Sequence, residues 1–530
     1  MSARPVRYLC VLFLLALMPV GTVGCRRGAQ PSGEPRYLLY NNQAEPEYLD
    51  PGMMSGNVEL RLSLALFEGL TLYDPKDLHP IPGTAERWEV SRDGRVYTFF
   101  LRKDAKWSDG HSVTAHDFVY AWERILNPKT GAKYSFALYY IKNAEAYNTG
   151  KLTDPAILGM KAINDHTLQV TLENPTPYFL NLTSYYPYMP LPRWAIERHG
   201  NNWTRPENIV TNGPFRLTHW IPQKEILVVK NPDYWDAAAV KLPGIRFLPV
   251  DDDATALKMY EGGQVDITEE PPPAQLPALM GRPDLVKSAF LATYLYRLNT
   301  TRPPLNDARV RRALAMAIDR VTLCESYLQR AKIPWASMVP AGLSGYTPAT
   351  GPDFNPEEAR RLLSEAGFAD PSAFPPVTIL YNTDEGHRLI AQVIQQMWRQ
   401  HLGIEVKLQN QEWKSYLKEM RQLNYDIARY GWIADYPDPT TFLEIFLSYA
   451  GENMTGWANQ AFDRLLSAAK QEPNNVKRMA ILKQAEEVLL REVPAIPIYT
   501  YVRWTLVKPH VKGYYPNLLD IHPFKAISLE

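Results

Sequence analysis

The residue of this chain that is best placed for ligand chemistry is Asp435, in the stretch Tyr425–Leu443 (YDIARYGWIADYPDPTTFL). The stretch begins with alternating residues, which predict a strand over Tyr425–Arg429 that runs into Gly431 and Trp432. Asp435 follows three residues after the tryptophan, and prolines stiffen the loop beyond it. A carboxylate just past a strand end, beside an indole ring, suits reception of a cationic group. The pattern is also typical of a turn cap, so the rest of the chain has to decide.

The elements before this stretch form a strand–helix–strand unit. Val377–Tyr381 is predicted as a strand, His387–Leu402 as a helix and Ile404–Leu408 as a second strand. A connection of this length is typical of a right-handed crossover between parallel strands. In open α/β sheets, ligands lie beyond the carboxyl ends of the strands. The residues that follow these strands and the Tyr425 strand are therefore expected to gather at one edge: His387, Trp413 and Asp435.

No motif in the chain supports catalysis. The sequence contains no H-E-x-x-H, G-x-S-x-G, Walker A or dinucleotide-binding pattern, and no Cys/His spacing suits zinc. We therefore expect no cofactor, no metal and no enzymatic activity, and a secreted peptidase stays as an alternative. The 57 basic residues balance 57 acidic ones, which leaves no basic surplus for nucleic acid. Aromatic residues make up 12% of the chain, which fits contact surfaces around small polar ligands.

The N-terminal residues have the pattern of an export signal followed by a tether. Two arginines precede an apolar run, Tyr8–Val20, of about 13 residues, which is shorter than the roughly 20 that a membrane-spanning helix needs. Small residues then lead to Cys25 as in a bacterial lipobox, although Thr22 stands where that pattern prefers leucine. The prediction is a signal peptide over 1–24, lipidation at Cys25 and a polar tether over 25–35. Ordinary cleavage nearby, which would release a free protein, is the alternative.

The pattern of elements changes along the chain. Between about residues 70 and 190, strands in tandem with few helices predict a largely antiparallel segment. After Tyr294–Leu298, strands and helices alternate. Because 530 residues are too many for one core, two or three domains are expected. Cys324 is expected to be a small buried residue of an amphipathic helix.

Eight further fragments occur along the chain: LFEGL (Leu66–Leu70), KWSDG (Lys106–Gly110), VTAHDFVYAW (Val113–Trp122), NIVTNGPF (Asn208–Phe215), NPDYWD (Asn231–Asp236), NDARVRRALAMAIDR (Asn306–Arg320), EEARRLLSEAGF (Glu357–Phe368) and NQEWKSYL (Asn410–Leu417). In this order, and together with Tyr425–Leu443, they resemble the extracytoplasmic solute-binding proteins of peptide ABC transporters (solute-binding protein family 5), specifically the oligopeptide-binding branch. The resemblance covers essentially the whole chain after the leader.

The resemblance implies an α/β fold of the periplasmic-binding-protein-like type (class II), with two lobes and an extra inserted α+β domain. Lobe I would comprise 36–67, 193–296 and 500–530, the insert 68–192, and lobe II 297–499. It further implies a lipid-anchored, monomeric receptor outside the cytoplasmic membrane, which closes around oligopeptides by hinge motion and delivers them to a permease. Within the family, a dipeptide, a murein peptide, a metal chelate or a sugar is the alternative ligand.

The resemblance also assigns residues to the ligand. Asp435 would receive the peptide's α-ammonium, and the backbone of Gly431 would pair with the extended peptide as an added strand does. Trp413 and Trp432 would wall side-chain pockets. Arg429 and His387 would bind the peptide's C-terminal carboxylate. Further contacts with the peptide would come from Tyr134 and Tyr296, at the border of the insert and at the hinge, and from Ser55 and Asn57, in a loop of the first lobe. The alternatives are lobe packing for the aromatic residues, a structural ion pair for the arginine and a surface position for the histidine.

Overall fold

The computed structural model describes residues 35–54, 56–272 and 274–530, without the side chains at positions 385, 413 and 414. Residues Tyr37–Glu530 form one compact unit, which is described here by itself. The predicted signal peptide, nearly all of the predicted tether and the predicted lipidation site Cys25 lie outside the described residues. Within the described part, no helix is both long and apolar enough to span a bilayer.

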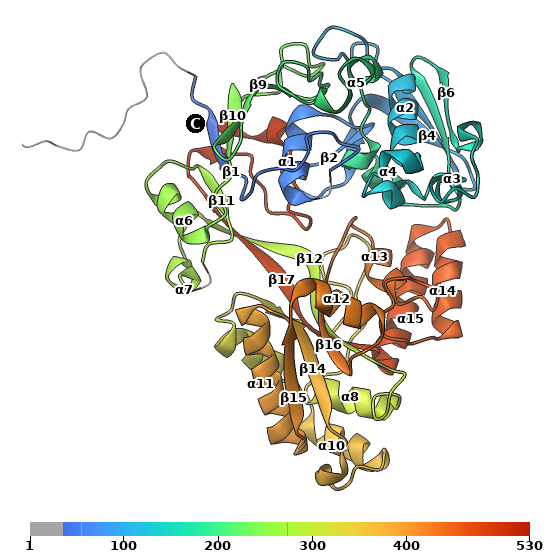
Figure 1. The fold of residues 1–530 in the computed structure, drawn as a ribbon, viewed down its shortest axis with the longest axis vertical. Coiled ribbons are helices and arrows are strands. Elements are labelled where there is room, and N and C mark those ends of the chain that lie inside the picture. The colour runs from blue at the N-terminus through green and yellow to red at the C-terminus, as the bar shows by residue number, and fades with distance from the viewer. Residues whose placement is uncertain (1–34, 55, 273) are drawn as a thin grey trace, which may run out of the picture. The chain divides into compact units, whose positions relative to one another are not determined.

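A mixed sheet of eleven strands in the described chain organises the unit (Figure 1). Its order is β15 (Val406–Gln411), β14 (Val377–Asn382), β16 (Ile427–Ile433), β12 (Leu285–Leu298), β17 (Ala495–Val507), β11 (Ile267–Glu269), β1 (Leu38–Asn41), β10 (Gly244–Leu248), β9 (Glu225–Lys230) and β8 (Phe215–Ile221), with β13 (Ile333–Pro334) paired to β17 off this path.

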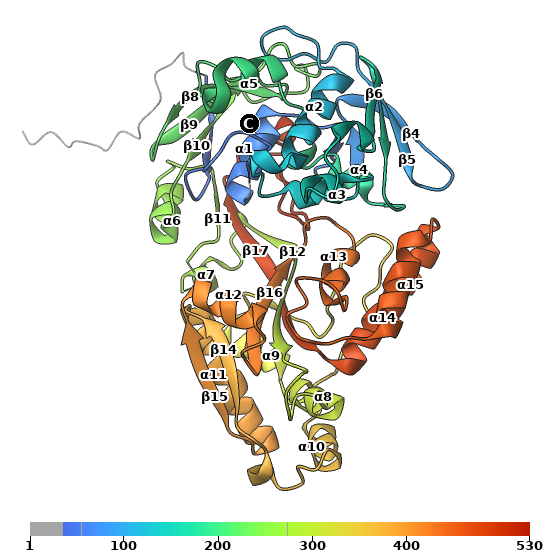
Figure 2. The same ribbon diagram turned by 45° about the vertical axis from the view of Figure 1, so that its right-hand side comes forward.

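The long strands β12 and β17 connect the two halves of this sheet. They pair antiparallel from Leu285 opposite Leu506 to Arg297 opposite Ala495. Near one end β17 also pairs with β11, and near the other end β12 pairs with β16. Figures 1 and 2 show the pair as the link between the upper and the lower group of elements.

The predicted order of strand, helix and parallel strand in the crossover unit is confirmed, but the predicted bounds of its second strand, Ile404–Leu408, are wrong, because this strand runs over Val406–Gln411. Strand β14, helix α11 (Glu385–Leu402) and strand β15 follow one another, and β14 pairs with β15 in parallel. Asp384 caps α11 by accepting a hydrogen bond from the backbone N–H of His387 (2.8 Å). Gly403 ends the helix at φ +71°, a conformation that favours glycine. Strand β16 is also parallel to β14.

The predicted bounds of the Tyr425 strand are wrong. The strand was expected over Tyr425–Arg429, but β16 runs over Ile427–Ile433. The reason is its partner, because β12 pairs with β16 along its whole length, up to Ala292 opposite Ile433. Asp435 therefore follows the strand end by two residues.

The antiparallel segment predicted between about residues 70 and 190 contains a four-stranded antiparallel sheet, in the order β4 (Ala85–Val90), β5 (Val96–Leu101), β7 (Thr167–Thr171) and β6 (Met160–Asn164). Two separate two-stranded sheets complete the described strands. In the same segment β2 (Thr71–Tyr73) pairs with β3 (Pro80–Pro82), and near the C-terminus β18 (Val511–Lys512) pairs with β19 (Ser528–Leu529). The helices besides α11 are α1 (Asn57–Leu66), α2 (Ala115–Leu126), α3 (Ala144–Asn148), α4 (Phe179–Leu182), α5 (Arg193–His199), α6 (Asp253–Glu261), α7 (Leu276–Leu279), α8 (Ala308–Met316), α9 (Arg320–Thr322), α10 (Pro356–Glu365), α12 (Trp413–Arg421), α13 (Thr440–Leu443), α14 (Gln460–Gln471) and α15 (Asn475–Glu492).

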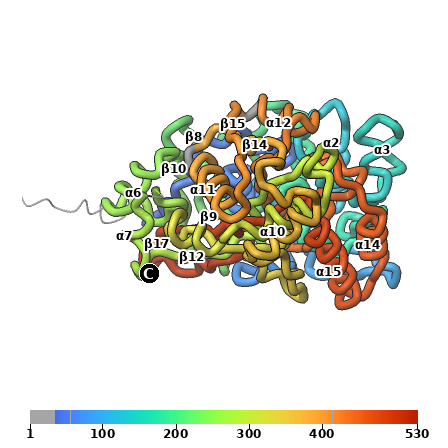
Figure 3. Tube along the Cα trace, turned by 90° about the horizontal axis from the view of Figure 1, so that it is seen from below, coloured from blue at the N-terminus to red at the C-terminus, as the bar shows by residue number. Residues whose placement is uncertain are grey.

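The buried apolar residues fall into separate clusters on the two sides of the β12–β17 pair. One large cluster joins residues between Leu38 and Ile267 with the C-terminal segment that ends at Ile527, and it also includes Tyr436 from the loop after β16. Beyond β12, α11 packs in one cluster, whereas α14 and α15 pack in another, and Figure 3 shows these two helices side by side and apart from α11. Cys324 is buried in a short helical segment, as predicted.

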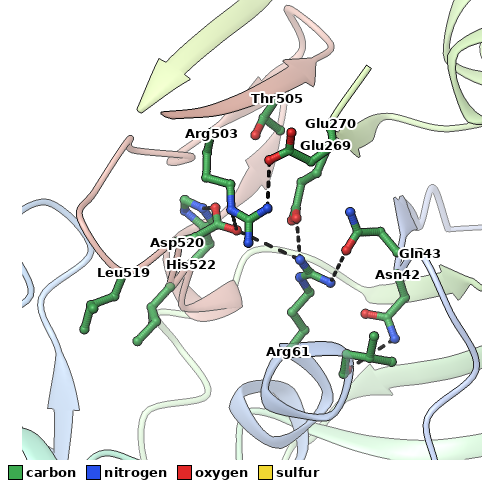
Figure 4. Close-up of polar contacts among 12 residues, drawn as sticks. Asn42, Gln43, Arg61, Glu269, Glu270, Arg503, Thr505, Leu519, Asp520 and His522 are labelled. Carbon is green, nitrogen blue, oxygen red and sulfur yellow. Dashed lines mark hydrogen bonds and ion pairs between the residues drawn. The ribbon is translucent and has the colours of Figure 1, made fainter. Parts of the chain in front are cut away.

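A network of buried and half-buried charges connects β17 to the elements around β11 (Figure 4). Arg61 from α1 forms an ion pair with Glu269, and Arg503 from β17 forms one with Glu270 (2.7 Å). Asp520, from the C-terminal loop, lies 3.6 Å from Arg503 and 4.0 Å from Arg61. Because each charge faces an opposite one, the network is tolerated in the interior, and removal of one partner would leave a buried charge unpaired.

Candidate functional site

The loop that carries Asp435 is fixed on both sides of this residue. Before it, the backbone N–H of Ala434 donates to the carbonyl of Leu291 on β12 (2.8 Å). After it, the ring of Tyr436 stacks on that of Tyr178, with centroids 4.4 Å apart and planes inclined by 5°. The backbone N–H of Asp435 itself donates to the Thr441 hydroxyl (3.4 Å). The position of the carboxylate is therefore set by contacts that do not involve the carboxylate.

The Asp435 carboxylate has no hydrogen bond or ion pair with any described residue. Burial raises its pKa to about 6. Asp435 is nevertheless exposed to solvent as a residue, so the shift comes from protein atoms that crowd around the carboxylate, while water still reaches part of it. A carboxylate in this state gains from any cation that replaces the missing water.

Asp435 lines a cavity of about 240 Å³ that is walled by aromatic side chains. Trp432 and Tyr134, both predicted as ligand contacts, line it as well, together with Tyr185. The indole Nε1–H of Trp432 donates to the Thr441 hydroxyl (3.2 Å), so the hydroxyl that receives the Asp435 N–H also orients the indole. The structure thus brings three of the predicted residues together.

Arg429 and His387 form a second group. The Arg429 guanidinium donates to the Tyr501 hydroxyl (3.1 Å) and to Asn382 Oδ1 (3.3 Å), and it lies 4.9 Å from the Tyr294 ring centroid. Its Nε is buried without a hydrogen-bond partner, and no carboxylate of the described residues pairs with it. A buried guanidinium that lacks an anion is suited to bind one.

His387 lines a different cavity, of about 380 Å³, together with Lys332 and Tyr501. Its Nδ1 is 3.4 Å from the Tyr294 hydroxyl. Burial, and next the positive charge of Arg429, lower the pKa of His387 to about 4, although Asp384 opposes the shift. The imidazole is therefore neutral at pH 7. The three strands end as parallel neighbours, as expected, but His387 and Asp435 line separate cavities and do not converge in one.

The other predicted residues are placed less directly. Gly431 pairs with Tyr294 across β16 and β12, and a Cβ at this position would lie 3.1 Å from the Tyr501 hydroxyl. Tyr296 is fully buried opposite Arg429, and its hydroxyl has no hydrogen-bond partner among the described residues. Asn57 is exposed at the start of α1 and lines neither cavity. Ser55 and the Trp413 side chain lie outside the described residues.

Several residues of the two cavities were not predicted from the sequence. Glu444 and Glu452 line the Asp435 cavity, and Lys332 and Tyr501 line the other. Two features of the sequence could have drawn attention to the Asp435 cavity: the acidic residues that follow Asp435 at short intervals and the tyrosine-rich segment Tyr178–Tyr188. Neither signal identifies a cavity wall until the segments are brought together.

Comparisons with known proteins agree with this architecture. The sequence model of bacterial extracellular solute-binding proteins, family 5 (middle), matches residues 79–454. The chain is 39% identical over 492 residues to the periplasmic oligopeptide-binding protein OppA of Salmonella typhimurium, which covers 90% of this chain and 89% of that protein. It is 38% identical over 500 residues to the periplasmic murein peptide-binding protein MppA of Escherichia coli, which covers 91% of this chain and 92% of the relative.

Solved structures of such proteins superpose over nearly the whole chain. The TM-score is 0.84 with the unliganded open form of MppA, at 36% identity and with 94% of this chain and 98% of the other covered. It is 0.76 with Haemophilus influenzae OppA in complex with the peptide RPPGFSPFR, at 34% identity and with coverages of 94% and 99%. The described unit therefore has the two-lobed α/β fold that the sequence predicted.

Proposed function

Because this chain belongs to the bacterial extracellular solute-binding proteins of family 5, we propose that it captures oligopeptides outside the cytoplasmic membrane and delivers them to the permease of an ABC transporter. The observation that carries the proposal is the pair of unsatisfied charges around β16. Neither charge has a counter-ion among the described residues: the carboxylate of Asp435 follows this strand, and the guanidinium of Arg429 lies within it. These charges are complementary to the two ends of a peptide.

The spacing of the two charges favours a peptide over a single amino acid. Asp435 lies six positions after Arg429, which corresponds to at most roughly 20 Å at the rise of a strand, and the chain is in β16 as far as Ile433. Along this length no described strand pairs with the edge of β16 that faces β14, since β14 pairs only with Ile427 and Ala428. The Arg429 carbonyl accepts a hydrogen bond from the Tyr416 hydroxyl, so the backbone from Tyr430 onward is the part that a ligand strand could pair with. A peptide can add to that edge as a further strand, whose main-chain hydrogen bonds do not depend on its side chains.

In this proposal the peptide's α-ammonium binds Asp435, and Arg429 receives its carboxylate. A charge-assisted hydrogen bond contributes about 1.5–3 kcal/mol, and closure of the lobes about β12 and β17 would strengthen both contacts by excluding water. Tyr134, Trp432 and Gly431 would contact the first residues, whereas His387 and Tyr296 would support Arg429. The proposal requires no cofactor and no catalytic step. The protein would act as a monomer that a lipid on Cys25 holds at the membrane.

Other solutes fit this arrangement less well. A sugar would leave both Asp435 and Arg429 without a counter-charge, and a metal chelate would leave the open edge of β16 unused. A dipeptide is too short to reach from one charge to the other at the spacing above. A murein peptide has an amine and carboxylates and is therefore the nearest competitor.

Retention of peptides from a defined library tests the proposal. The protein is incubated with tripeptides to hexapeptides, separated from free peptide and analysed by mass spectrometry. We expect intact peptides to be retained by the natural protein and to be retained in smaller amounts by Asp435→Asn. Cleaved products would indicate a peptidase, and an empty protein would refute peptide capture. The mass of any ligand that co-purifies decides between ordinary and murein peptides.

A further inference from the structure

The charge of the Asp435 cavity exceeds what one ammonium can neutralise. Three carboxylates line the cavity: Asp435, Glu444 and Glu452. Its described lining residues include no lysine, arginine or histidine. Lys470 on α14 forms an ion pair with one of these carboxylates, and its Nζ lies 3.2 Å from Oε1 of Glu444. With all groups ionised, two negative charges remain in the cavity after Lys470 is counted.

A neighbouring carboxylate, that of Asp438, has a counter-ion that the carboxylates of the cavity can be compared with. Asp438 is buried and forms a bidentate ion pair with Arg478, with both distances 2.7 Å. Among the described residues, no carboxylate of the cavity has an arginine partner, and only Glu444 has an ion pair, with Lys470. Glu452 is exposed and only accepts a hydrogen bond from the Tyr430 hydroxyl (3.1 Å). Burial raises the pKa of the Glu444 carboxyl although Lys470 opposes the shift, so Lys470 does not fully compensate for the loss of water.

The walls of the cavity suit an organic cation. Tyr134, Tyr140, Tyr185 and Trp432 line it, and the faces of such rings attract ammonium and guanidinium groups. The volume of about 240 Å³ is below the range of roughly 300–1,000 Å³ that is usual for whole drug-sized ligands. The cavity therefore fits one residue of a ligand and not the whole of it.

We propose that this cavity selects peptides whose first residue is basic. The α-ammonium binds Asp435, and the lysine or arginine side chain of the same residue lies between the aromatic walls and binds Glu444 and Glu452. This inference rests on the proposed function, because it needs a peptide whose N-terminus is at Asp435. It adds a side-chain preference that neither the amine site nor the backbone pairing supplies.

A matched pair of tripeptides tests the preference. Lys-Ala-Ala and norleucine-Ala-Ala have first side chains of similar length and differ mainly in the terminal ammonium. In calorimetry at pH 7 we expect Lys-Ala-Ala to bind at least about tenfold more tightly. Glu444→Gln and Glu452→Gln should each reduce this ratio at least about threefold, whereas Lys470→Met should increase it because it removes the competing cation.

Two controls locate the effect. Glu405→Gln, at an exposed position outside the cavity, should leave the ratio unchanged. Ala-Ala-Lys and Ala-Ala-norleucine should give a ratio that does not respond to Glu444→Gln. If Glu444→Gln unfolds, Glu452→Gln decides, since Glu452 is exposed. If the natural protein binds Lys-Ala-Ala less than about threefold more tightly than norleucine-Ala-Ala, or if the glutamine variants leave this affinity ratio unchanged, the preference for a basic first residue is refuted while peptide capture stands. If neither tripeptide binds, peptide capture itself is refuted.

Discussion

The substitution Asp435→Asn isolates the charge of the proposed amine receptor. Asparagine keeps the size of the side chain and its capacity for hydrogen bonds but removes the negative charge. The substitution breaks no contact with a described residue, because the carboxylate has none and the backbone N–H keeps its bond to Thr441. The loss of a charge-assisted hydrogen bond, about 1.5–3 kcal/mol, corresponds to a loss of affinity between about tenfold and 150-fold. Because the carboxylate is accessible to water, we expect a value nearer tenfold.

The pH dependence gives an independent sign of the same group. Asp435 binds an ammonium as the carboxylate, so affinity is complete above its pKa of about 6 and is lost as the pH falls through this value. Between pH 7 and pH 5 the ionised fraction drops from about nine-tenths to about one-tenth, which raises Kd about tenfold. His387, with a pKa of about 4, stays neutral over this range. Glu444 also faces the cavity and titrates in the same direction, so the comparison with Asp435→Asn isolates the share of Asp435.

Calorimetry with Ala-Ala-Ala at pH 5, 6 and 7 measures both effects. Because bound ammonium lowers the pKa of Asp435, binding at pH 6 should release protons, which two buffers of different ionisation enthalpy detect. Asp251→Asn, at an exposed position outside the cavity, is the control. A Kd of Asp435→Asn within about threefold of the natural protein at pH 7, or an unchanged pH slope, would refute the amine receptor.

Three further substitutions test the surroundings. Gly431→Val adds a branched side chain where a Cβ would lie 3.1 Å from the Tyr501 hydroxyl, so peptide Kd should rise at least about tenfold in calorimetry, and an unchanged Kd would exclude this edge of β16 from the site. Arg478→Met leaves the Asp438 carboxylate buried without a cation, which costs about 3–5 kcal/mol of folding stability, so the urea midpoint should fall. The double variant with Asp438→Leu should regain part of the lost midpoint, and a midpoint unaffected by Arg478→Met would refute the stabilising role of this ion pair. Arg429→Gln should weaken binding of a hexapeptide acid, which is long enough to reach from Asp435 to Arg429, more than that of its C-terminal amide, and equal losses would contradict the carboxylate contact.

The parts of the fold that were predictable have local signals. The crossover unit follows from an alternating strand, a capped amphipathic helix that ends at Gly403 and a second strand. The extension of β16 to Ile433 has no local signal, because it is set by pairing with β12, more than a hundred residues earlier. The separation of Asp435 from His387 was also unpredictable, since parallel strands predict a common edge but not which cavity each side chain lines.

The candidate site was predictable in its residues but not in its charge balance. Glu444 and Glu452 differ in no sequence feature from exposed acids, and only the position of α13 and the following turn brings them to the cavity of Asp435. Their significance depends on the absence of cations among its described lining residues. Such an absence is a property of the assembled wall and has no counterpart in a stretch of sequence.

Asp435 and Asp438 show this limit most directly, because they are three residues apart and identical in type. Asp438 is buried against Arg478, which lies forty residues further along the chain, and this pair stabilises the loop in the absence of ligand. The raised pKa of Asp435 means that its ionised form is less stable in the folded, ligand-free protein than in water, so this residue reduces the stability of the unoccupied protein above pH 6. A bound ammonium removes that cost. Peptides with a free amine should therefore raise the melting temperature at pH 7.5, by mass action, more than their N-acetylated counterparts at equal concentration. In Asp435→Asn the difference should largely disappear, and if it persists undiminished, another group binds the amine.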